Sequence, residues 1–236
     1  MGIVQARTGS TRLPGKVLKP VCGRTLLEHQ MERMLRARSL DRLVVATTTS
    51  PADDAIVDLV RARGWICHCG SETDVLSRYA EAARAEGAAV VVRMTMDCPL
   101  IDPEVVDLVV GMLRGGPFDF VTNNLEPTFP HGLDLEAFTR PTLDAADRDA
   151  VAAFDREHVS PFVRDRPDRF RIGNVRSPSD LHHHRWTVDY PEDLAFVRAV
   201  YEALYRPGGF FSTADVLALL AERPELMRIN EGQGTA

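Results

Sequence analysis

Short apolar runs alternate with helical patterns five times in the first 120 residues, and this alternation constrains the fold more than any other feature of the sequence. The apolar runs are typical of strands that are buried on both faces. The stretches between them carry apolar residues at helical spacing. We therefore predict an α/β fold, in which a mostly parallel, Rossmann-like sheet carries helices on both faces.

The same patterns predict the positions of individual elements. Strands are expected from Ile3 onward and over 43–49, 65–67, 88–93 and 118–121, with 88–93 at the centre of the sheet. Helices are expected to begin at the capping residues Thr25, Ser50, Thr73 and Asp102. The later part predicts strands over 133–138 and 185–189, helices over 142–153, 157–163 and 191–205, a last helix capped by Ser212, and a frayed tail from Asn230.

The length of 236 residues favours a single domain that spans 1–236. The regular alternation loosens between about 123 and 175, where prolines interrupt it, and returns near Arg185. We interpret 123–175 as an insertion into an otherwise regular α/β domain.

Charge and composition exclude several classes of function. A net charge of −6 argues against a general nucleic-acid binder or a membrane-surface protein. The sequence has neither a run of 18 apolar residues nor a basic-then-apolar signal segment at its N-terminus. Four cysteines in a chain of this length do not make a disulfide framework, so we expect the reduced cytoplasm. Any anion site must be built locally.

Residues 3–17 contain such a local site: an apolar strand followed by a loop rich in glycine, hydroxyl and basic side chains. Gly9 and Gly15 allow backbone N–H groups to face a ligand without an intervening Cβ. The three cations of the loop are Arg7, Arg12 and Lys16. Loop amides and converging cations suit a polyphosphate, whose charge is spread over many oxygens. A basic surface turn is the alternative interpretation.

The loop is not a Walker A motif. Five residues separate Gly9 from Gly15, whereas that motif has four, and Val17 stands where the magnesium-binding Ser or Thr would be. The pattern therefore indicates a triphosphate loop of another kind.

The sequence at 3–18 reads Ile-Val-Gln-Ala-Arg-Thr-Gly-Ser-Thr-Arg-Leu-Pro-Gly-Lys-Val-Leu. It resembles the opening motif of the sugar-acid cytidylyltransferases, which include the synthetases of CMP-Kdo and CMP-sialic acids, and it is most like the spore-coat-polysaccharide (SpsF-like) branch. Further matching motifs spread the resemblance over about residues 3–200. The resemblance implies a nucleotidyltransferase sheet of the GT-A type, a homodimer and a place in polysaccharide biosynthesis.

The resemblance also implies the reaction. An acceptor oxygen attacks the α-phosphorus of CTP, and pyrophosphate leaves, with Mg²⁺ as cofactor. The residues that it implies as catalytic are Arg7, Arg12, Lys16, Asp97 and Asp189. The loop cations would neutralise the β- and γ-phosphates and the leaving pyrophosphate, and positioning and charge would supply most of the catalysis.

Two carboxylates are candidate magnesium ligands. Asp97 follows the predicted central strand, in a segment that resembles the family's Asp-x-Pro-Leu-Ile motif. Asp189 lies in a segment that resembles its Val-Asp-x-Pro-Glu-Asp-Leu motif. Mg²⁺ prefers one or two protein carboxylates, with phosphate oxygens and waters completing its shell. The alternatives are a turn residue for Asp97 and a helix cap for Asp189, and Asp102 is interpreted as a helix cap.

Nucleotide binding is expected at the carboxyl ends of the strands, where ligands of such sheets bind. The nucleotide-binding residues that we predict are Gln5, Ala6, Arg7, Gly9, Ser10, Thr11, Arg12, Lys16, Thr47, Thr48, Asp53, Ser71, Thr73 and Asp74. Those from Thr47 onward are expected near the base, because the family binds the base near the ends of its second and third strands. Arg78 is interpreted as a surface cation.

The acceptor is expected to bind in the insertion. Segments 132–136 and 156–159 resemble the branch's Gly-Leu-Asp-x-Glu and Arg-Glu-His-Val motifs. The predicted acceptor-binding residues are His131, Gly132, Asp134, Glu136, Arg156, Glu157, His158 and Arg185. Arg156 and Arg185 would pair with a carboxylate or phosphonate of a small acidic acceptor. A solvated charge network is the alternative for each of them.

Two other functional classes remain possible at this point. A GT-A-type glycosyltransferase would use a nucleotide sugar, but it usually carries an Asp-x-Asp pair, which Asp97-Cys98-Pro99 does not supply. A non-catalytic nucleotide-binding protein could retain the fold, although the loop cations and both aspartates argue against it. Zinc binding at Cys67-His68-Cys69 or at His182–His184 is disfavoured, because neither spacing suits one metal.

Overall fold

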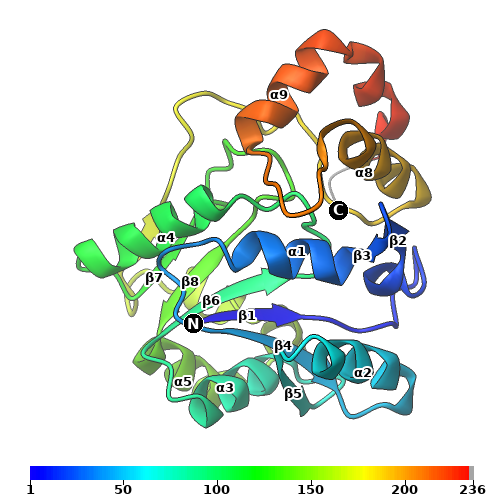
Figure 1. The fold of residues 1–236 in the computed structure, drawn as a ribbon. Helices are drawn as coiled ribbons and strands as arrows, with labels where there is room; N and C mark the ends of the chain where they lie inside the picture. Colours follow the sequence, from blue (N-terminus) through cyan, green and yellow to red (C-terminus); the bar gives the residue numbers. More distant parts are fainter. Residues whose placement is uncertain (234–236) are drawn as a thin grey trace.

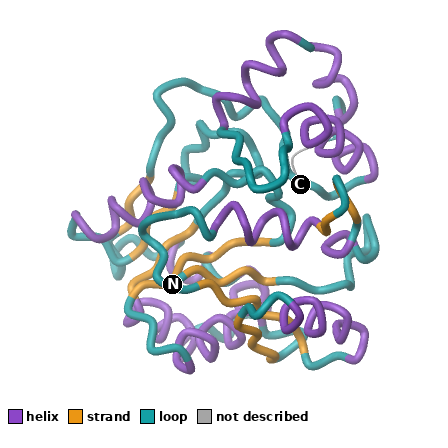
Figure 2. Tube along the Cα trace, in the orientation of Figure 1, coloured by secondary structure: helices purple, strands orange, loops and turns teal. Residues whose placement is uncertain are grey.

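The computed structural model describes residues 1–233, and its centre is a seven-stranded sheet (Figures 1 and 2). Its strands are β1 (Gly2–Gln5), β4 (Leu43–Thr48), β5 (Ile66–Gly70), β6 (Val90–Thr95), β7 (Phe120–Thr122), β8 (Glu136–Thr139) and β9 (Ile172–Asn174). They lie in the order β5-β4-β1-β6-β8-β7-β9. Only β8 runs antiparallel to its neighbours, β6 and β7. The predicted α/β class, the mostly parallel sheet and the central position of 88–93 are confirmed.

The helices cover both faces of the sheet. They are α1 (Leu26–Met34), α2 (Asp54–Ala62), α3 (Val75–Ala85), α4 (Pro103–Gly115), α5 (Arg140–Asp149), α6 (Ala153–His158), α7 (Pro161–Arg164), α8 (Pro191–Leu204) and α9 (Thr213–Glu222). Figure 1 shows α1 and α4 above the sheet, α8 and α9 farther out on the same side, and α3 and α5 below. One core cluster unites the upper helices with the sheet, and a second unites α3, α5 and α7 with its other face.

Shorter elements connect these layers. They are the 3₁₀ helices η1 (Lys16–Leu18), η2 (Pro51–Asp53) and η3 (Pro224–Asn230) and the hairpin strands β2 (Pro20–Val21) and β3 (Arg24–Thr25). No helix within residues 1–233 combines the length and the apolar character needed to cross a bilayer.

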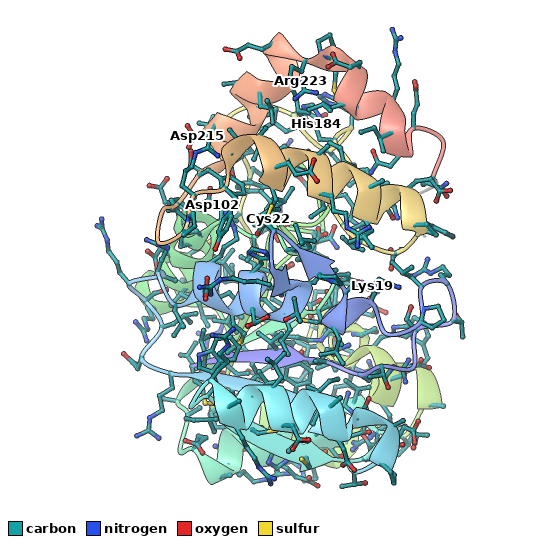
Figure 3. All side chains as sticks on the ribbon, turned by 45° about the vertical axis from the view of Figure 1, so that its right-hand side comes forward. Lys19, Cys22, Asp102, His184, Asp215 and Arg223 are labelled. Carbon is teal, nitrogen blue, oxygen red and sulfur yellow. The ribbon has the colours of Figure 1, made fainter. Side chains whose placement is uncertain are left out.

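Capping side chains fix several helix starts as predicted. Thr25 and Ser212 each form a reciprocal capping box at the start of α1 and α9. Asp102 caps α4 and also accepts hydrogen bonds from the backbone and hydroxyl of Thr213, so one carboxylate holds two helix starts together. Figure 3 shows Asp102 below Asp215, where α9 begins. The predicted cap Thr73 is wrong, because Asp74 accepts the hydrogen bond at the start of α3.

Two predictions for the later part of the chain are wrong, and one strand was not predicted. Residues 185–189 do not form a strand: Trp186 N–H donates to His131 and Val188 N–H to Asp97, so this segment pairs with two different loops. The expected helix 157–163 is split into α6 and α7, because Val159 has a φ of +70° and Pro161 begins a new turn. Strand β9 was not predicted, since Ile172–Asn174 is too short to carry a period.

The region 123–175 is built into the sheet, because β8 lies between β6 and β7 and β9 forms one edge. The tail is also better held than expected. Asn230 is buried and donates hydrogen bonds to the Arg185 carbonyl and the Asp193 carboxylate. Residues 234–236 of the expected frayed tail lie outside the described residues.

Candidate active site

A cavity opens where the carboxyl ends of β1 and β6 meet, which is the point where the strand order reverses direction. We call it the loop cavity; its volume is about 240 Å³. All eight residues predicted from the first motif line it: Gln5, Ala6, Arg7, Gly9, Ser10, Thr11, Arg12 and Lys16. The loop that follows β1 therefore forms one wall, and Thr95, Met96 and Asp97 after β6 form the opposite one.

Asp97 and Asp189 converge on one ammonium group in this cavity. Lys16 Nζ lies 3.0 Å from Asp189 Oδ1 and 3.5 Å from Asp97 Oδ2, and it donates to the Val188 carbonyl at 2.7 Å. Arg12 Nη2 also pairs with Asp189, at 2.9 Å. The two carboxylates, from distant parts of the chain, thus share a single cation position.

The Asp97 carboxyl is held in its charged form. Burial alone would raise its pKa, but the Lys16 ammonium and the hydrogen bond from the Thr95 hydroxyl outweigh burial, so the pKa lies below its usual value. An ionised, partly buried carboxylate next to a displaceable cation is suited to binding a metal ion.

A buried ion pair supports Asp189 from behind. Arg185 donates from Nε and Nη2 to the two oxygens of Asp193, at 2.8 and 2.9 Å, and its Nη2 lies 3.4 Å from Asp189 Oδ2. Asp193 also accepts from the backbone N–H of Asp189, at 2.9 Å. The Asp193 side chain is fully buried. The direction of Asp189 is therefore fixed through both its main chain and its side chain.

A second cavity, of about 350 Å³, lies next to the loop cavity, and we call it the His131 cavity. The residues common to both linings are Arg12, Thr95, Asp97 and Asp189. The two carboxylates therefore lie where the cavities meet. Groups bound in the two cavities can therefore approach one another beside these carboxylates.

Half of the predicted acceptor-binding residues line the His131 cavity: His131, Asp134, Glu136 and His158. Gly132 lies behind this wall, with a φ of +111°, and a Cβ there would come within 2.6 Å of the Thr187 backbone nitrogen. Burial raises the pKa of the Asp134 carboxyl, which the hydrogen bond from the Gly132 N–H only partly offsets.

The other predicted acceptor residues are engaged elsewhere. Arg156 pairs with Asp74 at 2.6 Å and with Asp147 at 2.9 Å. Arg185 is committed to Asp193, and Glu157 is exposed on α6. None of the three lines either cavity.

The residues predicted near the base do not line the loop cavity either. Thr47, Thr48 and Asp53 are buried beneath the loop, where Asp53 accepts hydrogen bonds from Thr48 and from the Thr8 backbone and hydroxyl. Of the later group, Ser71 offers its carbonyl to Arg78, Thr73 is exposed, and Asp74 caps α3 and pairs with Arg156. Thr48 and Asp53 hold the loop in place.

Sequence reasoning missed several residues of the two cavities. Arg78 is not a surface cation: its side chain is buried and lines the loop cavity, and burial lowers its pKa. Arg93 lines the His131 cavity and pairs with Glu136 at 2.7 Å. A charged residue inside the most apolar strand was a usable signal for Arg93, because a buried charge needs a partner. No local pattern distinguished Arg78.

A basic loop and two carboxylates at the junction of two cavities, on a sheet of this topology, define a nucleotidyltransferase. Residues 1–204 match the sequence profile of a family described as cytidylyltransferase. The chain is 30% identical to the spore coat polysaccharide biosynthesis protein SpsF of Bacillus subtilis, covering 94% of each. The protein thus belongs to the cytidylyltransferase family, and the predicted resemblance is confirmed.

Solved structures agree with this assignment. A cytidylyltransferase from Leptospira borgpetersenii superposes with a TM-score of 0.91 at 30% identity, covering 100% of this chain and 98% of the other. A CMP-Kdo synthetase solved with CTP has a TM-score of 0.64 at 19% identity, over 86% of this chain and 98% of the other. The second comparison supports the fold alone.

Proposed function

We propose that this enzyme transfers CMP from CTP to an oxygen of a small acidic acceptor, a sugar acid or a phosphonate, and releases pyrophosphate. The observation that carries the proposal is the pair of cavities that share Asp97 and Asp189. CTP would place its phosphates in the loop cavity, and the acceptor would occupy the His131 cavity. Their reacting atoms would then meet beside the two carboxylates. By likeness to SpsF, we also propose a place in polysaccharide biosynthesis.

The residues present fit a magnesium ion. Asp97 and Asp189 supply two hard oxygen donors. The Lys16 ammonium group lies between them, in the place that a metal ion would take. A bound Mg²⁺ would polarise the α-phosphate and offset the charge that develops on it. When the metal binds, Lys16 would be free to turn from the carboxylates toward the phosphates in the same cavity.

The chain's own groups would perform the remaining tasks. Arg7, Arg12 and Lys16 bind the phosphates and stabilise the negative charge of the departing pyrophosphate. Backbone N–H groups of the glycine-containing loop add further donors. The acceptor hydroxyl attacks the α-phosphorus from the His131 cavity, in line with the bond to pyrophosphate that breaks, and releases its proton to solvent.

The acceptor's acidic group would meet different side chains from those expected. Arg156 and Arg185 are engaged with aspartates. Within the described residues, the basic groups that line the His131 cavity are Arg12, Arg93, His131 and His158. Arg93 pairs with Glu136, and Arg12 pairs with Asp189 and is assigned to the phosphates, so we infer that the two histidines recognise the acid, while Asp134 and Glu136 bind hydroxyl groups.

We further propose a homodimer that uses the surface around α6. Val151 and Phe154 are exposed there, at 94% and 58%, and the Phe154 ring packs against His158, which lines the His131 cavity. Sedimentation velocity of the wild type and of Phe154→Glu tests this. The wild type should sediment as a dimer and the variant as a monomer; a monomeric wild type would contradict the proposal.

Calorimetric titration tests the donor and the metal. CTP, UTP, ATP and GTP are titrated with and without Mg²⁺ into the wild type and into Asp97→Asn. We expect a magnesium-dependent preference for CTP that Asp97→Asn weakens. Preferential binding of nucleotide sugars over free CTP would overturn the proposal in favour of a glycosyltransferase. A screen of sugar acids and phosphonates, read by pyrophosphate release, then identifies the acceptor.

A further inference from the structure

A buried carboxylate, Asp193, organises the segment that carries Asp189. Its side chain has no exposed surface, and it accepts hydrogen bonds from the backbone N–H groups of Asp189 and Tyr190, at 2.9 and 3.0 Å. It also accepts both donors of the Arg185 fork. Burial alone would raise its pKa, but these hydrogen bonds outweigh burial and lower it. The carboxylate is therefore ionised and well satisfied.

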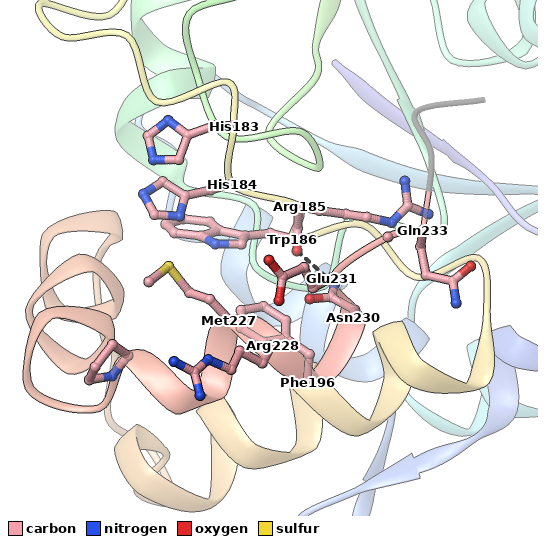
Figure 4. Close-up of a pocket in the computed structure, with 12 residues that line it drawn as sticks. His183, His184, Arg185, Trp186, Phe196, Met227, Arg228, Asn230, Glu231 and Gln233 are labelled. Atoms are coloured by element: carbon pink, nitrogen blue, oxygen red, sulfur yellow. Dashed lines mark hydrogen bonds between the residues drawn. The ribbon is translucent and has the colours of Figure 1, made fainter.

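The last donor to this carboxylate comes from the far end of the chain. Asn230, at the end of η3, donates from Nδ2 to Asp193 Oδ1 at 3.0 Å and to the Arg185 carbonyl at 3.0 Å. Figure 4 shows Asn230 next to Arg185 and Trp186, at the base of the pocket formed by η3 and the 183–186 segment. Asn230 is buried, and it lies beyond residue 204, where the family match ends.

We propose that Asn230 is a positioning residue for the metal-binding aspartate, so that the C-terminal segment completes the active centre. The inference rests on the proposed function, because it takes Asp189 as a magnesium ligand. The chain of contacts runs from Asn230 to Asp193, and from Asp193 to the main chain of Asp189 and to Arg185. Each link is a hydrogen bond to a charged group, which is stronger than a neutral one.

The physical effect of losing Asn230 follows from what its amide holds. Without it, Asp193 loses one buried donor and the Arg185 carbonyl loses its partner from η3. The 185–189 segment is not part of a strand; its remaining main-chain contacts are the hydrogen bonds from Trp186 N–H to His131, from Val188 N–H to Asp97 and from Lys16 to the Val188 carbonyl, none of which holds Asp189 itself. Asp189 would then sample more orientations, and metal affinity would fall, because groups that orient a metal ligand are worth about tenfold or more in affinity.

The test measures metal binding directly. Free Mn²⁺ is followed by electron paramagnetic resonance while it is titrated into the full-length protein with saturating CTP and no acceptor. The variants are Asn230→Ala, Asn230→Asp and Asp97→Asn. Leu220→Ala is the matched control, because Leu220 is buried in α9 and its truncation should lower stability. Thermal melting of each variant is recorded in parallel.

We expect Asn230→Ala to weaken Mn²⁺ binding about tenfold, while CTP binding measured without metal changes less than about twofold. Asn230→Asp keeps the shape but places a carboxylate against Asp193, so it should weaken Mn²⁺ at least as much as alanine does. If the role were packing alone, the isosteric aspartate would be milder than alanine, and Leu220→Ala would reproduce the loss; either result overturns the inference.

Asp97→Asn separates this inference from the proposed function. If Asp97→Asn weakens Mn²⁺ binding but both Asn230 variants bind normally, the metal site stands and the positioning role is wrong. If Asp97→Asn also binds Mn²⁺ normally, the proposed metal site is wrong, and the inference that depends on it falls with it.

Discussion

The loop cavity and the His131 cavity differ in how the chain builds them. The loop cavity takes eight of its lining residues from one stretch, residues 5–16, directly after β1. The His131 cavity is assembled from β6, from the segments around Asn124, 131–136 and Thr187, and from α6. One cavity is a local structure on a strand end, whereas the other exists only after distant segments have packed.

The difference shows which site residues a sequence can reveal. In the loop cavity, residues that are neighbours in the sequence are also neighbours in space. A sequence motif there predicts the residues that line the cavity. For the His131 cavity, a basic residue that the sequence suggests can instead pair with an acid of another element and stay outside the cavity. Arg156 of α6 does so, because it pairs with Asp74. The two cavities should therefore respond differently to substitution.

The largest effect is expected from Lys16→Ala in the loop cavity. Lys16 is the cation shared by Asp97 and Asp189, and it lies beside the expected phosphates. Losing a group that stabilises developing charge costs about 3–4 kcal/mol, so kcat should fall about 10²- to 10³-fold. Steady-state pyrophosphate release measures it.

Lys19→Ala is the matched control for Lys16→Ala, because Lys19 lies one turn away and lines neither cavity. It should retain kcat within about twofold. An equal loss of kcat in both variants would mean that positive charge anywhere near the loop is enough. Such a result would contradict a specific role for the residues that line the loop cavity.

A smaller and more selective effect is expected from Glu136→Gln in the His131 cavity. Glu136 pairs with the half-buried Arg93, and the neutral amide would leave that cation poorly matched. We expect the acceptor KM to rise about tenfold, from a loss of roughly 1.4 kcal/mol, with CTP affinity unchanged. Initial rates at varied acceptor concentration and calorimetry with CTP separate the two effects.

Glu126→Gln serves as its control, since Glu126 pairs with Arg176 at 2.6 Å on the exposed surface of the same region. Such a surface pair contributes little, so neither KM nor CTP affinity should change. A fall in CTP affinity with Glu136→Gln would show that binding in the His131 cavity and binding in the loop cavity are energetically coupled.

Much of the fold was predictable because its signals are local. The apolar runs placed the parallel strands, and Thr25, Asp102 and Ser212 marked helix starts through their own side chains. The 185–189 segment was not predictable in the same way. Its extended residues read as a strand, but whether a partner strand lies beside them depends on the tertiary fold.

The same reasoning explains the outcome for the site. The first motif located every loop residue of its cavity. Asp53 was expected to contact the base, yet it lies below the loop and holds Thr8. A sequence can show that a polar residue belongs to a strand end, but not whether its side chain faces the ligand or supports the backbone that does.

Asp53→Asn tests this supporting role on the nucleotide side. Burial alone would raise the pKa of the Asp53 carboxyl, but hydrogen bonds from Thr48 and Thr8 lower it, so the ionised form stabilises the fold. The variant should lose about 2 kcal/mol of unfolding free energy at pH 7, and CTP affinity should fall as the loop loosens.

The sign of the pH dependence follows from the lowered pKa. The stabilisation by ionised Asp53 is present above the unfolded-state pKa, near 3.8, and is lost as the pH falls through the lower folded-state value. Urea unfolding should therefore show that the free energy of unfolding of Asp53→Asn differs from that of the wild type by a constant amount between about pH 8 and 5. This difference should become smaller only below about pH 4. A difference that disappears near neutrality would contradict the assignment.

Asp134→Asn should have the smallest effect of these variants, and it should raise the free energy of unfolding, whereas Asp53→Asn lowers it. This opposite sign would distinguish the two cavities. Burial raises the pKa of the Asp134 carboxyl, so at pH 7 the folded protein holds this charge at a cost that the unfolded chain does not bear. The neutral amide keeps an oxygen for the Gly132 N–H and should stabilise the fold by on the order of 1 kcal/mol. Urea unfolding at pH 7.5 and 5 measures this difference in unfolding free energy between the variant and the wild type. The difference should become smaller as the pH falls toward the raised pKa, because the Asp134 carboxyl of the wild type then takes up a proton. Asp134→Ala removes the hydrogen bond as well and should lose the gain. A destabilising Asp134→Asn would show that the acceptor side, like the nucleotide side, depends on its carboxylate for stability.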